Sequence, residues 1–267
     1  MSSFRVTDGE SFRLADHDAA DKDGFEGGKA EGRAAVAKLT DRLDALQEKF
    51  YADGRHRLLV VLQGMDTAGK GGAIRRVFEG MNPSGVRVAS FKAPTAPELA
   101  HDFLWRIHPQ VPGDGEIVIF DRSHYEDVLI ARVRGLVPKE RWEARYDHIR
   151  HFERMLADEG TTIRKFFLHL SRDEQKSRLE ARLADPAKHW KFRKGDLDER
   201  ELWDDYQEAY EAAIGHTATE HAPWYVVPAD RKWMRDLVIC KALVETLEGL
   251  DMEFPEPEGD LTGITVS

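Results

Sequence analysis

The sequence has a single cysteine and no long apolar run, and these absences exclude several classes of protein. Cys240 alone cannot form an intramolecular disulfide, and no group of cysteines is present that could bind zinc. No stretch reaches the roughly 18 apolar residues of a membrane-spanning helix, and the first residues lack the apolar segment of a secretion signal. We therefore expect a cytoplasmic protein with no membrane partner, in which Cys240 fills space in the core.

Excess positive charge is also absent. The 267 residues include 39 Lys and Arg against 49 Asp and Glu, and the formal net charge is -10. Proteins that bind nucleic acids non-specifically usually carry the opposite sign, so we expect no nucleic-acid partner. With 41% hydrophobic residues, the chain can bury the core of one sizeable domain. Any polyanionic ligand would have to meet basic residues that are concentrated locally.

What is present is an alternation of short apolar runs with longer segments of helical periodicity. Strand character appears at 58–62, 86–91, 117–120, 163–170 and 225–227. Helical patterns occupy 70–80, 96–108, 124–133, 138–158, 172–184, 197–214 and 231–249. Strands separated by helices predict an α/β fold of three layers, with a parallel five-stranded sheet and helices on both faces. Ligands of such sheets bind beyond the carboxyl ends of the strands.

The two ends of the chain differ from this central pattern. Residues 1–30 are polar and rich in Gly and Asp, which predicts an extended or mobile arm, and 31–52 have the spacing of an amphipathic helix. We therefore divide the chain into an arm with its helix at 1–54, a main domain at 55–250 and an acidic tail at 251–267. Pro255 and Pro257 lead us to expect an irregular tail.

A glycine-rich loop follows the first predicted strand, where residues 64–71 read Gly-Met-Asp-Thr-Ala-Gly-Lys-Gly. Between a buried strand and a helix, this pattern is typical of a P-loop, whose backbone amides, helix N-terminus and lysine bind phosphates. A glycine-rich turn without a ligand is the alternative. The strand, the spacing and Lys70 together favour the P-loop.

The loop departs from the usual P-loop pattern at one position. Gly71 occupies the place of the Ser or Thr whose hydroxyl usually coordinates Mg²⁺. Asp66 lies inside the loop, and a carboxylate is a good ligand for Mg²⁺. We interpret Asp66 as the replacement metal ligand, with a turn-forming aspartate as the alternative.

A second candidate segment follows the third predicted strand, where 117–123 read Ile-Val-Ile-Phe-Asp-Arg-Ser. An apolar strand that ends in Asp is the second half of a P-loop site, in which the acid holds Mg²⁺ or its water. Arg122 supplies donors suited to phosphate, although a surface salt bridge would also account for it. The two segments together predict Asp66, Lys70, Asp121 and Arg122 as catalytic residues, with Asp66 and Asp121 holding the metal.

Basic residues are concentrated in one segment of this acidic chain. Between 176 and 194 there are seven Lys and Arg and two acids, which gives a local charge of +5. A solvated helix face is the alternative explanation of such a run. The cluster surrounds a break between two predicted helices, where P-loop kinases carry a lid that closes over the phosphates. We therefore predict a helical lid at about 176–200, and its surplus of cations suggests a polyanion longer than a triphosphate.

These segments resemble the polyphosphate kinase 2 family, a branch of the P-loop kinases with a fold similar to that of thymidylate kinase. The resemblance covers about 58–250 and rests on 64–72, 81–83, 91–95, 103–106, 121–123 and 186–191. It implies Mg²⁺-dependent, reversible transfer of a phosphoryl group between inorganic polyphosphate and a nucleotide. The run Ser-His-Tyr-Glu-Asp after Arg122 is similar to the third class of the family, which phosphorylates both AMP and ADP.

The resemblance also implies which residues bind each substrate. Polyphosphate would contact the loop and the lid, at Gly64, Ala68, Gly69, Lys70, Gly71, Gly72, Arg178, Arg182, Lys188 and Lys191. The nucleotide, whether AMP, ADP or ATP, would contact Asn82, Pro83, Lys92, Pro94, Thr95, Arg106, Arg122, Ser123, Tyr125 and Glu126. The cofactor would be Mg²⁺, with Mn²⁺ as a substitute, and the assembly would be a homodimer or homotetramer.

Two other functions share most of these features. An ATP-dependent nucleoside monophosphate kinase would have the same fold, but Gly71 and the surplus of lid cations argue against it. A non-catalytic module that binds polyphosphate or a nucleotide would not need Asp66 and Asp121 beside an anion. His124 also has two interpretations, a contact to ligand or a structural histidine.

Overall fold

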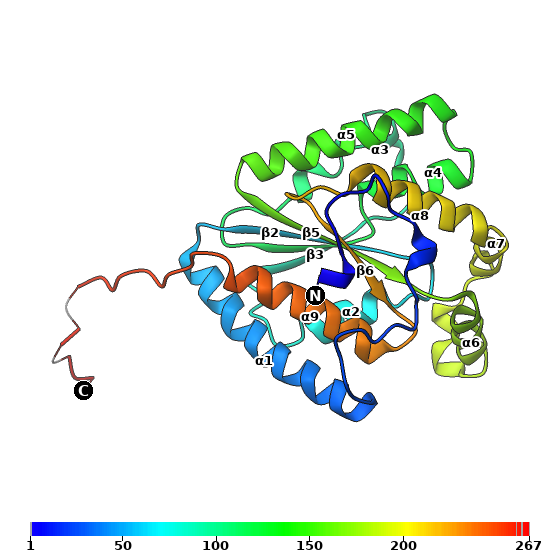
Figure 1. Ribbon diagram of the computed structural model, residues 1–267. Helices are drawn as coiled ribbons and strands as arrows, with labels where there is room; N and C mark the ends of the chain where they lie inside the picture. The colour runs from blue at the N-terminus through cyan, green and yellow to red at the C-terminus, as the bar shows by residue number, and fades with distance from the viewer. Residues whose placement is uncertain (1, 260, 263, 267) are drawn as a thin grey trace.

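The computed structural model describes residues 2–259, 261, 262 and 264–266, and they form an α/β fold of three layers (Figure 1). The sheet has six strands in the order β1-β6-β5-β2-β4-β3. The strands are β1 Arg5–Val6, β2 Arg57–Gln63, β3 Val86–Ser90, β4 Ile117–Asp121, β5 Thr161–His169 and β6 Trp224–Pro228. All neighbouring strands run parallel except β1, which pairs antiparallel with β6. The sheet is therefore mixed.

The antiparallel edge strand comes from the N-terminal segment, where no strand was predicted. Arg5 and Val6 pair with Tyr225 and Trp224. A two-residue strand is too short to show an alternation in the sequence, so the prediction of a five-stranded, purely parallel sheet was wrong. Buried apolar side chains also attach this segment to the body of the protein: Phe4, Phe12, Leu14 and Ala19.

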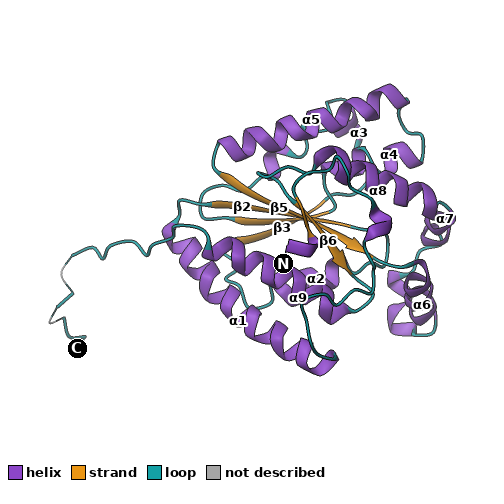
Figure 2. Ribbon diagram, viewed as in Figure 1, coloured by secondary structure: helices purple, strands orange, loops and turns teal. Residues whose placement is uncertain are grey.

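Helices cover both faces of the sheet (Figure 2). The longer ones are α1 Lys29–Asp53, α2 Lys70–Val77, α5 Lys139–Asp158, α6 Arg172–Leu183, α7 Gly195–Glu201, α8 Trp203–Thr217 and α9 Lys232–Glu248. The shorter ones are α3 Ala96–Leu99, α4 Ile130–Val133 and the 3-10 turns η1 Ser2–Phe4, η2 Leu14–Asp16, η3 His108–Gln110, η4 His124–Asp127 and η5 Pro186–Lys191. The central strands are thus enclosed between two helical layers, as their continuous apolar sequences require.

The central strand β2 shows why two helical layers are needed. Leu58, Val60 and Leu62 are buried in a core cluster with α1, α2 and α9. Leu59 and Val61 are buried in a second cluster with α5 and α8. Successive side chains of a strand point to opposite faces, and each fully buried Leu or Val stabilises the fold by about 1.5–3 kcal/mol. A strand with an apolar residue at every position is therefore most stable when a core covers each of its two faces.

Two predicted helices are much shorter than expected. Within 96–108 only α3 and η3 form, and the Asp102 side chain accepts a hydrogen bond from the Leu104 amide at 2.9 Å in a turn between them. Such a side-chain bond offers the backbone an alternative to the helix. Within 124–133 the chain forms η4 and the short α4 in place of one helix. Both segments lie beyond the carboxyl ends of strands, where irregular backbone can line a site.

Helices α1 and α9 pack closely where Gly32 meets Trp233. A methyl group at Gly32 would overlap the ring of Trp233. We therefore expect Gly32→Ala to lower the free energy of unfolding by about 1–3 kcal/mol, because the ring must shift. Urea denaturation would measure this loss, with Arg33→Ala, at an exposed position of the same helix, as the control. An unchanged midpoint for Gly32→Ala would contradict the packing described.

In the part of the chain that the structure describes, no helix is both long and apolar enough to cross a membrane. The described residues after α9 include no helix or strand. Met252 still packs in the core cluster with α1 and α9, and Figure 1 shows the chain beyond it leading away from the body.

Candidate active site

The loop at 64–69 connects the carboxyl end of β2 to the first residue of α2. Gly64 and Gly69 have φ angles of 155° and 102°, which favour glycine. Gly69 also lacks space for a side chain, because a Cβ atom there would collide with the guanidinium of Arg235. Since α2 begins at Lys70, the loop amides and the helix N-terminus lie together, in the arrangement that binds phosphates.

Arg178 of α6 holds the outer side of this loop. Its Nη1 donates to the carbonyl oxygens of Thr67 and Ala68 at 3.0 and 3.1 Å. Its Nη2 donates to the carbonyl oxygens of residues 229 and 230 at 2.6 and 3.1 Å, and its Nε donates to Glu174 at 2.7 Å. Five contacts to protein acceptors match the five N–H groups of a guanidinium. Arg178 therefore fixes the shape of the loop.

Two further side chains support the loop, and no sequence motif marked them. Arg235 of α9 is 3% exposed and donates from Nη1 to the carbonyl oxygen of Gly69 at 3.1 Å. Its other donors bind Asp236 at 2.8 and 2.6 Å. Gln175 of α6 donates to the carbonyl oxygen of Asp66 at 3.1 Å. The available signal for Arg235 was the pair Arg235–Asp236, which interrupts the apolar run at 233–240.

Lys70 lies within the site and is 9% exposed. Its Nζ donates to the carbonyl oxygen of Gly64 at 2.6 Å, across the mouth of the loop. Burial lowers the pKa of Lys70, and the carboxylates of Asp66, Asp121 and Glu126 oppose this effect. An ammonium has three donors, so the contact to Gly64 leaves further donors that can bind a phosphate.

Asp66 and Arg122 join the two predicted segments directly. Arg122 Nη2 donates to Asp66 Oδ1 at 2.9 Å, and each side chain is about one third exposed. Burial opposes ionisation of Asp66, but Lys70 and Arg122 outweigh it, and the pKa of this carboxyl is lowered. Burial likewise opposes the charge on Arg122, but Glu126 and Asp66 raise its pKa. The pair is therefore ionised at neutral pH.

The sheet register explains how residues so far apart in sequence meet. Asp121, the last residue of β4, pairs with Leu62 of β2, one residue before the end of that strand. Arg122 then adopts a φ of 64°, a left-handed conformation that costs a non-glycine residue about 1–2 kcal/mol. Strain of this kind persists where the surrounding structure enforces it, and it is concentrated at functional sites.

Glu126 adds another carboxyl group near Arg122 and Lys70. Burial raises its pKa, against the influence of Arg122 and Lys70. With its amide oriented to suit its neighbours, Gln63 donates to Glu126 Oε1 at 3.0 Å and accepts from Ser123 Oγ at 3.0 Å. Gln63, at the end of β2, thereby links the loop to the segment after β4.

The donors at this edge fit a magnesium ion. Asp66 and Asp121 both favour the charged form of Lys70, so both carboxylates lie near its ammonium group. Thr67 adds a buried hydroxyl without a hydrogen-bond partner among the described residues. In that part of the chain no preformed group of three His, Cys, Asp or Glu is present. Mg²⁺ commonly needs only one or two carboxylates, since water and substrate phosphates complete its coordination.

The predicted lid region forms α6, η5 and α7. Arg182 donates to the carbonyl oxygen of Lys191 at 3.1 Å and to Asp196 Oδ2 at 3.4 Å. It also contributes to the lowered pKa of Asp66, which places it near the loop. Lys188 is exposed, and its Nζ atom lies 2.7 Å from Asp185 Oδ2. Arg182 thus lies near the loop, and Lys188 belongs to η5, the segment that follows the same helix.

The segment predicted to contact the nucleotide begins where β3 ends, next to β4. Ser90 pairs with Asp121, so the chain that follows β3 runs beside Asp121 and Arg122. This chain carries Lys92, Pro94 and Thr95, all exposed. Arg106 turns back onto it and donates to the carbonyl oxygen of Lys92 at 2.8 Å.

The sequence of this chain also identifies the protein family to which it belongs. The sequence matches polyphosphate kinase 2 over residues 26–255. The chain belongs to the polyphosphate kinase 2 family. An AMP/ADP-polyphosphate phosphotransferase from Meiothermus ruber is 61% identical over 258 residues, which cover 97% of both chains. An ADP-polyphosphate phosphotransferase from Rhodopseudomonas palustris is 45% identical, over 95% of this chain and 91% of that protein.

A solved structure agrees with this assignment. The crystal structure of polyphosphate kinase 2 from Arthrobacter aurescens TC1 matches with a TM-score of 0.94 and 49% sequence identity, covering 97% of this chain and 92% of that one. The family resemblance inferred from the sequence is therefore confirmed.

Within this polyphosphate kinase 2 fold, most of the predicted residues gather at one edge of the sheet, but two do not. Asn82 and Pro83 precede β3, so they lie at the amino edge of the parallel strands, opposite the loop. There the backbone N–H of Asn82 donates to the side-chain Oε1 of Gln47, on α1, at 2.9 Å. The predicted order of strand, helix and parallel strand already implies this position, because α2 carries the chain from one edge of the sheet to the other.

Ser123 and Tyr125 also differ from the prediction that they contact a nucleotide. Both side chains are fully buried, as is His124 between them. Ser123 caps η4 by accepting a hydrogen bond from the Tyr125 amide at 3.1 Å. The structural interpretation of His124 therefore applies, and these three residues lie behind the site.

Proposed function

We propose that this protein transfers a phosphoryl group from inorganic polyphosphate to AMP and to ADP, giving ADP and ATP, in a reversible reaction. The observation that carries the proposal is the convergence of Asp66, Lys70, Asp121 and Arg122 at the carboxyl edge of the sheet. This convergence occurs in a chain 61% identical to a protein named AMP/ADP-polyphosphate phosphotransferase.

In the forward direction, the loop amides and Lys70 hold the terminal phosphate of polyphosphate. A phosphate oxygen of the nucleotide attacks that phosphorus from the side of Arg122. The new P–O bond forms as the bridging P–O bond breaks, and the shortened polyphosphate leaves with the electron pair on its oxygen. The attacking oxygen is already anionic near neutral pH, so no side chain has to remove a proton. Positioning and charge stabilisation therefore account for the catalysis.

A divalent cation completes the proposal. Asp66 and Asp121 would hold Mg²⁺, or Mn²⁺ in its place, and the ion would neutralise charge on the phosphates. Arg122 orients the acceptor phosphate and remains fixed by its ion pair with Asp66. Arg182, Lys188 and Lys191 follow the remaining polyphosphate along the lid. Since Arg178 is saturated by protein acceptors, its contribution is to keep the loop in shape.

The direct test supplies AMP or ADP with polyphosphate and Mg²⁺, without ATP, and resolves the products by chromatography. Formation of ADP and ATP is expected. Product from AMP only when ATP is added would replace the proposal with an ATP-dependent nucleoside monophosphate kinase. Binding of polyphosphate without product would replace it with a non-catalytic module. We also propose a cytoplasmic homodimer or homotetramer, which light scattering after gel filtration would test for oligomeric state.

The lid cations give a prediction about chain length. Lys188 and Lys191 are exposed, so their contribution is to attract distant phosphates of the donor. We expect the double variant Lys188→Ala with Lys191→Ala to raise the KM for long polyphosphate about tenfold, equivalent to about 1.4 kcal/mol, and the KM for a short chain less. Steady-state assays with donors of defined length would measure both.

The control for this pair removes the same charge elsewhere. Lys38 on α1 and Lys139 on α5 are both exposed, and their joint replacement by Ala should leave both KM values unchanged. Equal increases for long and short donors in the lid variant would exclude Lys188 and Lys191 from the polyphosphate path.

A further inference from the structure

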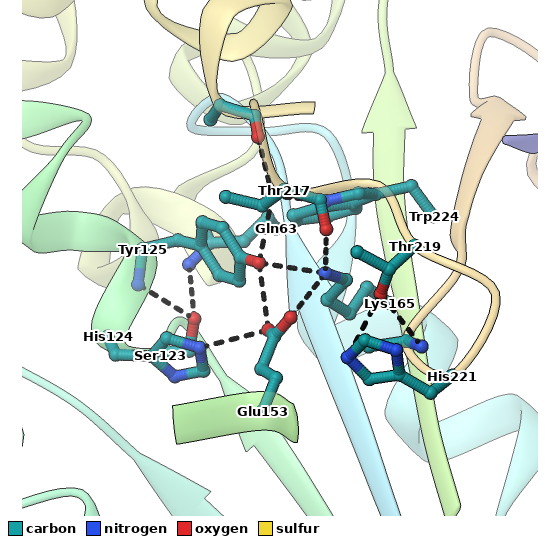
Figure 3. Close-up of polar contacts among 12 residues, drawn as sticks. Gln63, Ser123, His124, Tyr125, Glu153, Lys165, Thr217, Thr219, His221 and Trp224 are labelled. Atoms are coloured by element: carbon teal, nitrogen blue, oxygen red, sulfur yellow. Dashed lines mark hydrogen bonds and ion pairs between the residues drawn. The ribbon is translucent and has the colours of Figure 1, made fainter. Parts of the chain in front are cut away.

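A buried polar cluster surrounds the side chain of Tyr125, three residues after Arg122 (Figure 3). Its members are side chains at most 1% exposed, from four elements: His124 and Tyr125 of η4, Glu153 of α5, Lys165 of β5 and Thr217 of α8. None of these side chains can touch a substrate. Ionised groups are costly to bury, and the reaction described above does not use them, so their presence needs an explanation.

Lys165 is at the centre of the buried cluster and is fully satisfied. Its Nζ donates to Glu153 Oε2 at 2.6 Å, to Tyr125 Oη at 2.9 Å and to the carbonyl oxygen of Thr217 at 2.9 Å. Three acceptors match the three donors of an ammonium. The Nζ atom also lies 5.4 and 5.1 Å from the ring centres of Tyr125 and Trp224. The geometry therefore suits a charged lysine held in one position.

Glu153 binds the two residues of η4. Its Oε1 atom lies 3.2 Å from His124 Nε2 and 2.8 Å from Tyr125 Oη. Burial opposes ionisation of Glu153, but Lys165 and His124 outweigh it, and its pKa is lowered. The contact to Glu153 uses one ring nitrogen of His124, and the other, Nδ1, has no partner among the described residues. The cluster thus pairs one negative with one positive charge.

Only a short stretch of chain connects this buried cluster to Arg122. Tyr125 is three residues after Arg122, and Ser123 and His124 between them are fully buried. The left-handed backbone of Arg122 needs an external restraint, because an ordinary side chain disfavours it. The chain before Arg122 is fixed by the β4 pairing, and the chain after it is fixed by the contacts of His124 and Tyr125.

We propose that the Glu153–Lys165 pair positions Arg122 for phosphoryl transfer by anchoring His124 and Tyr125. This inference rests on the proposed function. Glu153, Lys165 and Tyr125 are positioning residues in this scheme, since they act through Arg122. A core built only for stability would not need them, because well-packed apolar side chains often replace a buried ion pair without loss.

The test uses Tyr125→Phe, which removes one hydroxyl, and the double variant Glu153→Met with Lys165→Met, which leaves no unpaired charge. For both we expect kcat to fall about 30-fold with the KM for AMP within about threefold of the wild-type value, because the loss lies in the transition state. Amide hydrogen exchange at 121–127 should become faster. The matched control is Leu43→Ala, which opens a cavity in the other core cluster and should lower Tm without these effects.

A second arm combines Tyr125→Phe with Arg122→Ala. If Tyr125 acts through Arg122, its substitution should cause almost no further loss of kcat once Arg122 is absent. A kcat loss below about tenfold in Tyr125→Phe, or an undiminished loss in the Arg122→Ala background, would overturn the proposal. Tyr125→Phe alone decides the question if the double methionine variant does not fold.

The exchange measurement separates this inference from the proposed function. If the wild-type protein does not transfer phosphate from polyphosphate, the proposed function fails. Unchanged exchange at 121–127 in Tyr125→Phe would overturn the anchoring itself, whatever the activity.

Discussion

Replacing Lys70 by Ala is expected to lower kcat for phosphate transfer by about 10³-fold or more, equivalent to about 4 kcal/mol of transition-state stabilisation. Lys70 is almost fully buried and is held at the loop by Gly64. A charge in such a place is worth more than one in water, because solvent screens it weakly. Steady-state assays with polyphosphate and AMP would measure the loss, and circular dichroism would verify the fold.

The control for Lys70→Ala is a lysine of the same chain without a place in the site. Lys139 on α5 is exposed and its Nζ atom lies 3.5 Å from Glu143 Oε1. Its replacement by Ala should change kcat by less than twofold. If Lys70→Ala retained near-normal turnover, the assignment of this loop as the phosphate-binding element would have to be abandoned.

Asp66→Asn is expected to lower kcat about 100-fold, or about 2.7 kcal/mol, and to raise the Mg²⁺ concentration required for half-maximal activity. The substitution keeps the size of the side chain but removes the charge that faces Lys70 and Arg122. It therefore weakens a proposed metal ligand and frees the guanidinium of Arg122 from its partner at 2.9 Å. A titration of activity against Mg²⁺ at saturating substrates would separate the two effects.

The lowered pKa of Asp66 also predicts how the wild-type enzyme responds to mild acid. The folded-state pKa of Asp66 is lowered, so the carboxylate is ionised throughout the neutral range. Its contribution to stability is present above the unfolded-state pKa and is lost only as pH falls through the folded-state value. Acidification from pH 8 to pH 6 should therefore not reproduce the loss in Asp66→Asn.

The matched control for Asp66→Asn is Asp147→Asn. Asp147 lies on α5, is largely exposed and pairs with Arg150 at 2.8 Å. It should leave both kcat and the Mg²⁺ dependence unchanged. A change in kcat below about threefold for Asp66→Asn, under about 1 kcal/mol, would remove Asp66 from the metal site.

Local patterns were enough to predict the main parts of the site. The buried strand before Gly64, the glycines of the loop and Lys70 are consecutive in the chain, so a short segment contains the whole signal. The same is true of the apolar strand that ends in Asp121. Parallel strands then bring the two segments to one edge, which general rules of α/β sheets predict.

The roles of individual side chains behind these segments depended on contacts that no local pattern contains. Arg235 reaches Gly69 although 166 positions separate them, and its helix looked like ordinary core. Tyr125 belongs to a motif that follows the strand, yet its hydroxyl binds Lys165 from β5 and is fully buried. Asn82 is a different case, because the predicted strand, helix and parallel strand already place it at the edge opposite the loop.

The sequence by itself determined the fold class, the phosphate-binding loop and the family of this protein, because each depends on residues that are neighbours along the chain. Only the tertiary structure decided that the sheet has an antiparallel edge, that Arg178 and Arg235 support the loop, and that Glu153 and Lys165 lie behind Arg122. These features arise when distant segments pack together. The side chain that satisfies a buried donor or acceptor can come from any element that reaches it.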